Sequence, residues 1–253
     1  MKGLLLGFVV TFSVVSHAQV WLPEENESSD IIQHLAITIG YSEYHELPRW
    51  VAYALRKEHL QDCADRSNNF RIDPTVRTGS ASPEDYQSSG YDRGHIAPAG
   101  DMKWSAQAMK ESFYMSNITP QTPGMNRGRW ANLELLARAW AKEGDETIIV
   151  SGPVLRDDLE RIGETGVSVP TEHYKVLLRT HAGRRSAIAF LMTQNPQSED
   201  LRTYALPVSK IEERTGLNFF PHLTKTEQHR IERVVDWSQW NFKAKFSYYA
   251  CSR

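Results

Sequence analysis

The chain alternates between short apolar runs and polar, turn-rich stretches, which predicts a mixture of strands and helices. Runs rich in β-forming residues predict strands over 35–41, 49–55, 147–150, 174–179 and 186–192. Apolar residues at helical spacing predict helices over 105–113, 128–143, 208–215 and 224–237, the third ended by Gly216. These alternating segments favour an α+β fold.

The remaining segments predict how the chain is organised. Residues 19–33 are polar and acidic and predict an irregular lead-in. Residues 63–90 are rich in Ser, Asn, Asp, Gly and Pro and predict a long loop, and long loops in compact domains are often functional. No internal repeat or clear linker divides the chain. A single mixed domain over 19–253 is therefore the simplest account.

The first 18 residues differ in pattern from the rest. Lys2 precedes an apolar run over 4–15, and Ser16 and Ala18 place small residues at the two positions that define a cleavage site. A membrane anchor fits less well, because about 20 apolar residues are needed to span a bilayer. The sequence therefore predicts a signal peptide over 1–18 and a periplasmic or secreted mature protein that is not attached to a membrane.

Composition excludes several classes of protein. Of 253 residues, 40% are hydrophobic and 24% charged, which argues against disorder and against a polytopic membrane protein. The net charge of −2 excludes a globally basic nucleic-acid binder but not a local basic groove. Cys63 and Cys251 are the only cysteines. The sequence leaves both a disulfide and two free thiols open, and the predicted export favours the disulfide.

The most informative stretch is 91–102. Asp92, Arg93 and His95 fall within four residues, and Gly94 allows a tight backbone turn between them. A neutral histidine can accept a proton near neutral pH, and an arginine can bind a phosphate with paired donors. A base beside a phosphate-binding group is what phosphodiester hydrolysis requires.

A second polar cluster follows at 116–134. Asn126 stands at the start of a predicted helix, with Trp130 and Glu134 at four-residue steps beyond it, so the three lie roughly on one side. An amide oxygen, with a carboxylate acting through water, suits Mg²⁺, which prefers oxygen ligands and keeps several waters. Taken singly, such residues are more often helix caps or solvated surface groups.

The ordered combination of these motifs is far more specific than any one of them. The order and spacing of these motifs resemble those of the DNA/RNA non-specific endonucleases, the family of secreted bacterial sugar-non-specific nucleases and of mitochondrial endonuclease G. The motifs are Asp92–His95, 97–98, 116–121 and 126–134. The resemblance covers about 35–221. It implies an α+β domain with a central antiparallel sheet and a ββα-metal (His-Me finger) site, in which a β-hairpin presents the histidine and a helix presents the metal ligand.

The resemblance also implies a role for each residue that matches the motifs. His95 is expected to be the general base, and Asn126 the direct ligand of Mg²⁺, with Mn²⁺ as a second candidate metal. Glu134 is expected to orient metal-bound water. Arg93 is expected to contact the phosphate. Catalysis would then use one base and one metal ion.

Further residues are assigned supporting and substrate-binding roles by the same resemblance. Asp92 is expected to brace the site and Asn117 to support it, while Arg127 and Arg71 are expected to contact substrate. A further phosphate-binding arginine is expected near Asn68, where Arg66 and Arg71 are the candidates. Together these predict a local basic groove, with Arg127, Arg129 and Arg138 on one side and Arg66, Arg71 and Arg93 on the other.

The implied activity is cleavage of DNA and RNA with little sequence preference, leaving 5′-phosphate ends. Because the attack needs no 2′-hydroxyl, both nucleic acids are expected substrates. A homodimer and an inhibitor protein are conceivable partners that no sequence feature selects. Three alternatives remain: a module that binds extracellular DNA without cutting it, a phosphodiesterase for small nucleotides, and an exported structural protein.

Overall fold

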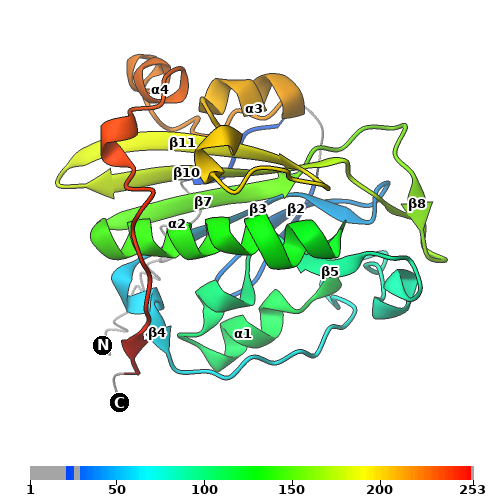
Figure 1. Cartoon of the computed structure of the whole chain (residues 1–253). Coiled ribbons are helices and arrows are strands. Elements are labelled where there is room, and N and C mark those ends of the chain that lie inside the picture. The colour runs from blue at the N-terminus through cyan, green and yellow to red at the C-terminus, as the bar shows by residue number, and fades with distance from the viewer. Residues whose placement is uncertain (1–20, 26–28, 252–253) are drawn as a thin grey trace, which may run out of the picture.

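The protein is built around one large sheet (Figure 1). The computed structural model describes residues 21–25 and 29–251. Within them, seven antiparallel strands lie in the order β1-β2-β3-β7-β10-β11-β12. The strands are β1 (Asp30–Gln33), β2 (Thr38–Ser42), β3 (Leu47–Leu55), β7 (Glu146–Pro153), β10 (Glu172–His181), β11 (Arg184–Thr193) and β12 (Ala205–Leu206). The predicted central antiparallel sheet is confirmed.

Helices cover both faces of this sheet. The long helix α2 (Ala131–Glu143) crosses one face, and α3 (Val208–Thr215) and α4 (Lys225–Glu232) cover the other (Figure 1). Because side chains alternate along a strand, one strand serves both layers. In β10, Leu177 packs in the core on the α2 side, whereas Val176 packs in the core on the side of α3 and α4.

A small hairpin stands beside the large sheet and leads into α2. Strand β5 (Asp92–His95) pairs antiparallel with β6 (Ile118–Gln121), and α1 (Ala106–Ser112) lies between them in sequence. A π-helical turn over Met125–Trp130 then connects β6 to α2. Two strands followed by a helix is the ββα order implied by the family resemblance, so the predicted fold class is confirmed.

Short elements complete the described part of the chain. They are the strands β4 (Gln61–Asp62), β8 (Arg161–Ile162), β9 (Val167–Ser168) and β13 (Tyr249–Ala250), and the 3₁₀ turns Lys57–His59, Pro83–Tyr86, Ala99–Met102, Met115–Asn117, Leu201–Tyr204 and Trp237–Gln239.

Several predicted boundaries are wrong for local reasons. The long helix begins at Ala131 rather than at Gly128, because Gly128 has non-helical φ and ψ of −107° and −106°. The last helix ends at Glu232, and Asp236 caps a separate turn by accepting from the Ser238 N–H. The lead-in predicted as irregular contains β1, which gains its structure by pairing with β2. The stop at Gly216 is confirmed, with φ of +73°.

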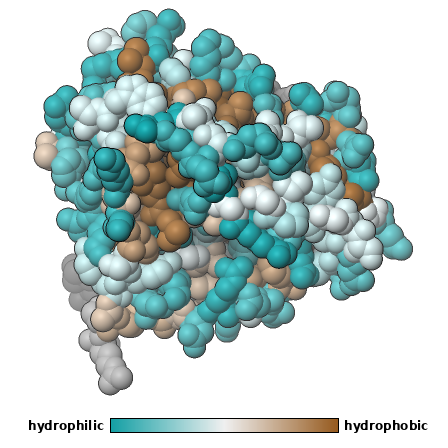
Figure 2. Space-filling view, viewed as in Figure 1, coloured by the Kyte–Doolittle hydropathy of each residue, from teal (hydrophilic) through white to brown (hydrophobic). Residues whose placement is uncertain are grey.

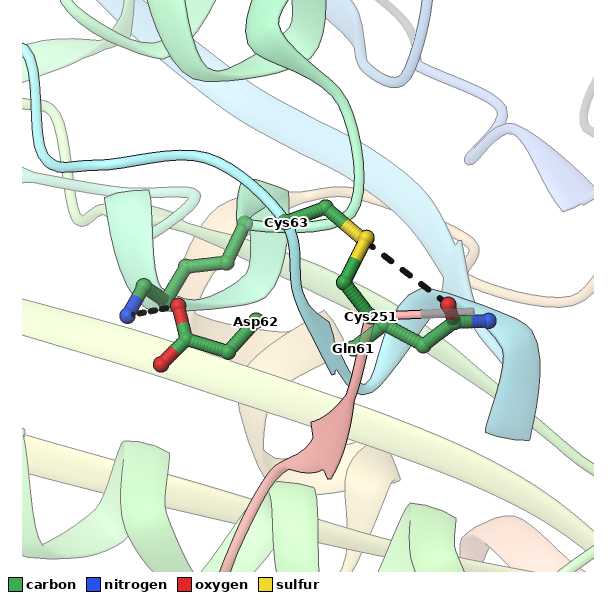
Figure 3. Close-up of a disulfide and its surroundings, with 5 residues drawn as sticks. Gln61, Asp62, Cys63 and Cys251 are labelled. Atoms are coloured by element: carbon green, nitrogen blue, oxygen red, sulfur yellow. Dashed lines mark hydrogen bonds and ion pairs between the residues drawn. A yellow bond between two sulfur atoms is a disulfide. The ribbon is translucent and has the colours of Figure 1, made fainter. Parts of the chain in front are cut away.

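The C-terminal segment returns across α2 to the start of the long loop. A disulfide joins Cys63 to Cys251, as Figure 3 shows, and β13 pairs in parallel with β4 beside it. Because Cys63 begins the loop that leads to the hairpin, one crosslink fastens both the C-terminal segment and that loop. Trp237 and Phe242 of the C-terminal segment help to line a groove. Figure 2 shows a largely hydrophilic face with its main hydrophobic area left of centre. None of the described helices is long and apolar enough to cross a membrane.

Candidate active site

His95 ends β5 in an aromatic enclosure. The ring centroids of Phe113 and Phe70 lie 4.7 Å and 5.3 Å from that of His95, and the histidine is only 7% exposed. Burial lowers the pKa of His95 to about 3, with a further lowering from the charge of Arg66. His95 is therefore neutral around pH 7. Its Nε2 is buried without a hydrogen-bond partner among the described residues, which leaves Nδ1 as the open nitrogen.

Close packing holds the hairpin that carries His95. A Cβ atom at Gly94 would lie 2.2 Å from Cδ of Gln121, whose side chain is fully buried, so glycine is required there. Asn117 braces the turn after His95: its Oδ1 accepts from the Ala97 N–H at 2.9 Å, and its Nδ2 donates to the carbonyls of Ala97 and Ser112. The position of the imidazole is thus set by backbone pairing and by one buried amide.

Asp92, at the other end of β5, holds two residues of the π-helical turn. Its Oδ2 accepts from Nδ2 of Asn126 at 2.9 Å, and Arg127 donates to both of its carboxylate oxygens, at 2.8 Å and 2.6 Å. Burial acts to raise the pKa of Asp92, but the hydrogen bonds from Arg127 and Asn126 outweigh it and hold the pKa below its ordinary value. Asp92 stays ionised and orients the Asn126 amide.

Glu134 lies on α2, two four-residue steps beyond Asn126. Burial raises the pKa of Glu134 to about 7, although Arg138, Lys175 and Arg66 act to lower it. The carboxylate is half-buried and forms no hydrogen bond or ion pair within the described part of the chain. Arg66 exerts its charge on both His95 and Glu134. One guanidinium on the long loop therefore lies near both the hairpin and the helix.

The residues fit a divalent cation with few protein ligands. Because Nδ2 of Asn126 is bound to Asp92, its Oδ1 is left without a partner among the described residues and can serve as an oxygen ligand. Among those residues, no three His, Cys, Asp or Glu side chains gather as a metal-binding group. A divalent cation that prefers oxygen ligands and keeps several of its own waters fits this arrangement better than a metal that needs several protein ligands.

The predicted arginine groove is only partly present. Arg138 lies on the buried side of α2 and is 5% exposed, and its guanidinium donates to Asp101 at 2.5 Å, so its placement in the groove is wrong. The position of Arg138 in the sequence does not show which side of the helix its side chain occupies, and the structure places it on the buried side. Arg129 is paired with Glu199 and donates to the carbonyl of Ser198.

The other arginines differ in what holds them. Arg93 is exposed, with its guanidinium 4.4 Å from the centre of the Phe70 ring beside His95. Arg66 is exposed and donates to Asn68 Oδ1 at 2.7 Å. Arg71 instead donates to the carbonyls of Asn69 and Lys110. Of the two candidates for the further phosphate-binding arginine, Arg66 is the one whose charge reaches His95.

Some residues of the site escaped the sequence reasoning. Phe113, which contacts His95, belongs to the predicted helix over 105–113, and its spacing gives no sign that it lies at the site. Lys175 is 1% exposed near Glu134, and a lysine inside an otherwise apolar strand was the signal that could have singled it out. In both cases the two residues come from separate elements of the fold.

Comparison with known proteins gives consistent matches. Residues 23–226 match the family described as DNA/RNA non-specific endonuclease. "Nuclease EXOG, mitochondrial" of Danio rerio is 36% identical over 250 residues, covering 92% of this chain and 72% of the relative. Human "Endonuclease G, mitochondrial" is 34% identical, covering 69% of this chain and 64% of the relative. A crystal structure of the EndoG/EndoGI complex superimposes with a TM-score of 0.72 at 31% identity, covering 77% of this chain and 87% of that one.

These names contradict one prediction. The two curated relatives are described as mitochondrial, so the predicted export to the periplasm or medium is wrong. That prediction rested on residues 1–18, which lie outside the described residues. A single lysine before a short apolar run is too unspecific a pattern to establish export.

Proposed function

The chain belongs to the DNA/RNA non-specific endonuclease family, and from this premise we propose that it is a Mg²⁺-dependent endonuclease that cuts both DNA and RNA and leaves 5′-phosphate ends. Membership makes the chain a metal-dependent enzyme that hydrolyses nucleic acids. The choice of Mg²⁺, the two substrates, the ends and the role of each residue are the proposal.

The observation that carries the proposal is the position of Arg66, whose guanidinium lies 5.1 Å from the centre of the Phe113 ring, which is itself 4.7 Å from the ring of His95. Its positive charge acts on the imidazole of His95 and on the carboxylate of Glu134 together. A neutral base and a water-orienting carboxylate therefore lie around one cation that can bind a phosphate. Asn126 stands in the π-helical turn that leads into α2, and Glu134 lies in the first turn of that helix.

The imidazole takes the proton in this scheme. Nδ1 of His95 accepts a proton from water, and the resulting hydroxide attacks phosphorus in line while the bond to the 3′ oxygen breaks. The departing 3′ oxygen takes a proton from solvent, which leaves a 3′-hydroxyl and a 5′-phosphate. General-base help of this kind contributes about 10²–10⁴-fold.

The other residues bind and orient. The carboxylate of Glu134 accepts hydrogen bonds from water in the site. Arg93 and Arg66 donate to oxygens of the scissile phosphate, with Arg93 held against Phe70. Oδ1 of Asn126 would hold the divalent cation, which would supply Lewis-acid stabilisation of the charge that grows during the reaction.

The test is digestion of plasmid DNA and total RNA with Mg²⁺, with and without a chelator. His95→Ala and Asn126→Ala are expected to fold and to lose activity by orders of magnitude, with labelled products carrying 5′-phosphate. Cleavage by His95→Ala at the wild-type rate would overturn the assignment of the base. Undiminished cleavage in excess chelator would overturn the metal requirement.

The same assay separates the remaining alternatives. A phosphodiesterase for small nucleotides would hydrolyse a dinucleotide at least as fast as a long duplex, and a pure binding module would cut neither. The proposal expects the long substrate to be cut faster, because the exposed Arg127 can contact a phosphate beyond the scissile one.

A further inference from the structure

We infer that Lys175, a buried lysine in the middle of β10, is a positioning residue that holds the carboxylate of Glu134 in place for the reaction. The inference rests on the proposed function of Glu134 and adds a residue to which neither the motifs nor the relatives' names give a role.

Lys175 occupies a position where a charge is unusual. It lies in the central sheet between Tyr174 and Val176, which are fully buried, and it is itself 1% exposed. Strand alternation places it on the same side as Leu177, which packs in the core beneath α2. An ammonium group in such a place needs partners, because leaving a charge unpaired in the interior is costly.

Two contacts orient the ammonium group. Nζ of Lys175 donates to Oγ of Ser151 at 2.8 Å, and the two residues stand directly opposite each other in the pairing of β10 with β7. The same Nζ lies 4.8 Å from the centre of the Trp130 ring, at the start of α2. Ser151 and Trp130 therefore direct the charge toward the first turns of the helix.

The first turns of α2 are where Glu134 lies. It follows Trp130 by four residues, so the two lie on one side of the helix. Glu134 has no hydrogen bond from a described residue, and the charged groups that act on it are Arg138, Lys175, Asp101 and Arg66.

Those other groups have partners of their own. Arg138 is bound to Asp101, and the second oxygen of Asp101 accepts from the Tyr53 hydroxyl at 2.7 Å. Arg66 is exposed on the loop, where solvent weakens its charge. Lys175 is thus the buried cation near Glu134 that forms no ion pair with another acid in the described chain. Burial lowers the pKa of Lys175 to about 8, and Glu134 acts to raise it, as expected if each stabilises the charge of the other.

The test is a double-mutant cycle between Lys175→Met and Glu134→Gln. Methionine keeps an unbranched apolar side chain and removes the charged Nζ. Lys175→Met is expected to lower kcat by about 10- to 100-fold with little change in KM for DNA, the usual range for a residue that supports a catalytic group. In the Glu134→Gln background the same change is expected to lower kcat less than about twofold, because its target is already gone. Lys142→Met, on the far turn of α2, is the control and should retain wild-type kcat.

One further measurement needs no metal-loaded enzyme, and a second variant keeps the inference testable if Lys175→Met does not fold. In the metal-free protein, carbon-13 titration of the Glu134 carboxyl is expected to show a higher pKa in Lys175→Met than in the wild type. If Lys175→Met does not fold, Ser151→Ala replaces it: it keeps the charge but removes the hydrogen bond to Nζ, and it should lower kcat in the wild-type background alone.

The outcomes distinguish the role of Lys175 from the role of Glu134. Wild-type kcat in folded Lys175→Met would overturn the inference, and so would an equal loss in both backgrounds, since that indicates a purely structural role. An unchanged pKa of Glu134 would also overturn it. Glu134→Gln with wild-type kcat would instead remove the role of Glu134 in the proposed function.

Discussion

Nδ2 of Asn126 donates to Oδ2 of Asp92 at 2.9 Å, across the junction between the hairpin and the π-helical turn. This bond decides which end of the amide is free. Since the nitrogen is held by the carboxylate, the oxygen is the atom left to bind a cation. An acidic residue at the start of β5 thereby prepares a neutral ligand on the following segment.

Removing that carboxylate should weaken metal binding. We predict that Asp92→Ala raises the Mg²⁺ concentration needed for half-maximal cleavage by about 10- to 100-fold, because a ligand that loses its supporting hydrogen bond is no longer held in one orientation. Calorimetric titration of Mn²⁺ into the protein measures the same change without turnover. Arg127→Met is the control, since it removes the other partner of Asp92 and keeps the bond to Asn126. Equal metal dependence in Asp92→Ala and wild type would contradict the prediction.

Replacing Arg66 should lower kcat/KM more than replacing Arg71. Arg66→Ala is predicted to lower kcat/KM by roughly tenfold or more, the value of one charged hydrogen bond to a phosphate. Arg71→Ala should have a smaller effect, because Arg71 is engaged with the carbonyls of Asn69 and Lys110. Steady-state cleavage of a labelled duplex measures both. A larger loss in Arg71→Ala would reverse the assignment.

Buried neutral histidines should make the protein sensitive to acid. Burial lowers the pKa of His173 to about 3, and its Nε2 lies 3.0 Å from Oγ1 of Thr119. Between pH 6.5 and 3 the unfolded histidine binds a proton and the folded one does not, so the free energy of unfolding falls as pH falls. The carboxyls of Glu134 and Glu232, whose pKa values are raised to about 7, act in the opposite direction between about pH 4.5 and 7.

A variant separates these opposing contributions. His173→Gln is predicted to reduce the acid-side slope of unfolding free energy against pH by on the order of 1 kcal/mol per pH unit. Urea unfolding at several pH values from 4 to 7 gives the slope, whatever the overall stability of the variant. Parallel curves for variant and wild type would show that His173 is not the source of the acid sensitivity.

The disulfide should contribute to stability through its topology. It joins residues 188 positions apart, and closing a long loop restricts the unfolded chain. Replacing both Cys63 and Cys251 with serine is predicted to lower the free energy of unfolding by about 2–5 kcal/mol. Hydrogen exchange should also become faster at Tyr249, whose N–H donates to the carbonyl of Leu60. Detection of two free thiols in the unfolded, unreduced wild type would contradict the pairing itself.

Local patterns were sufficient for much of the fold. The strand core at 174–179 and the helix at 208–215 were predictable because period-2 and period-3.6 spacing reflects which side of each element is buried. The glycine stop at Gly216 needed only backbone sterics. The start of α2 was not predictable from spacing, because the kink at Gly128 arises where the chain turns from the hairpin into the helix. The short strand β1 was missed because a partner strand stabilises it.

The sequence by itself determined the chemical groups of the candidate site and their order: Asp92, Arg93, His95, Asn126 and Glu134 stand in one ordered set of motifs. Only the tertiary structure decided which arginine's charge acts on the imidazole, which arginine is buried in an ion pair, and that a lysine of the central sheet lies beneath α2. Those facts depend on contacts between distant segments and on the burial of charge. Neither is encoded in local spacing, because the same side chain can be solvated or enclosed according to what folds over it.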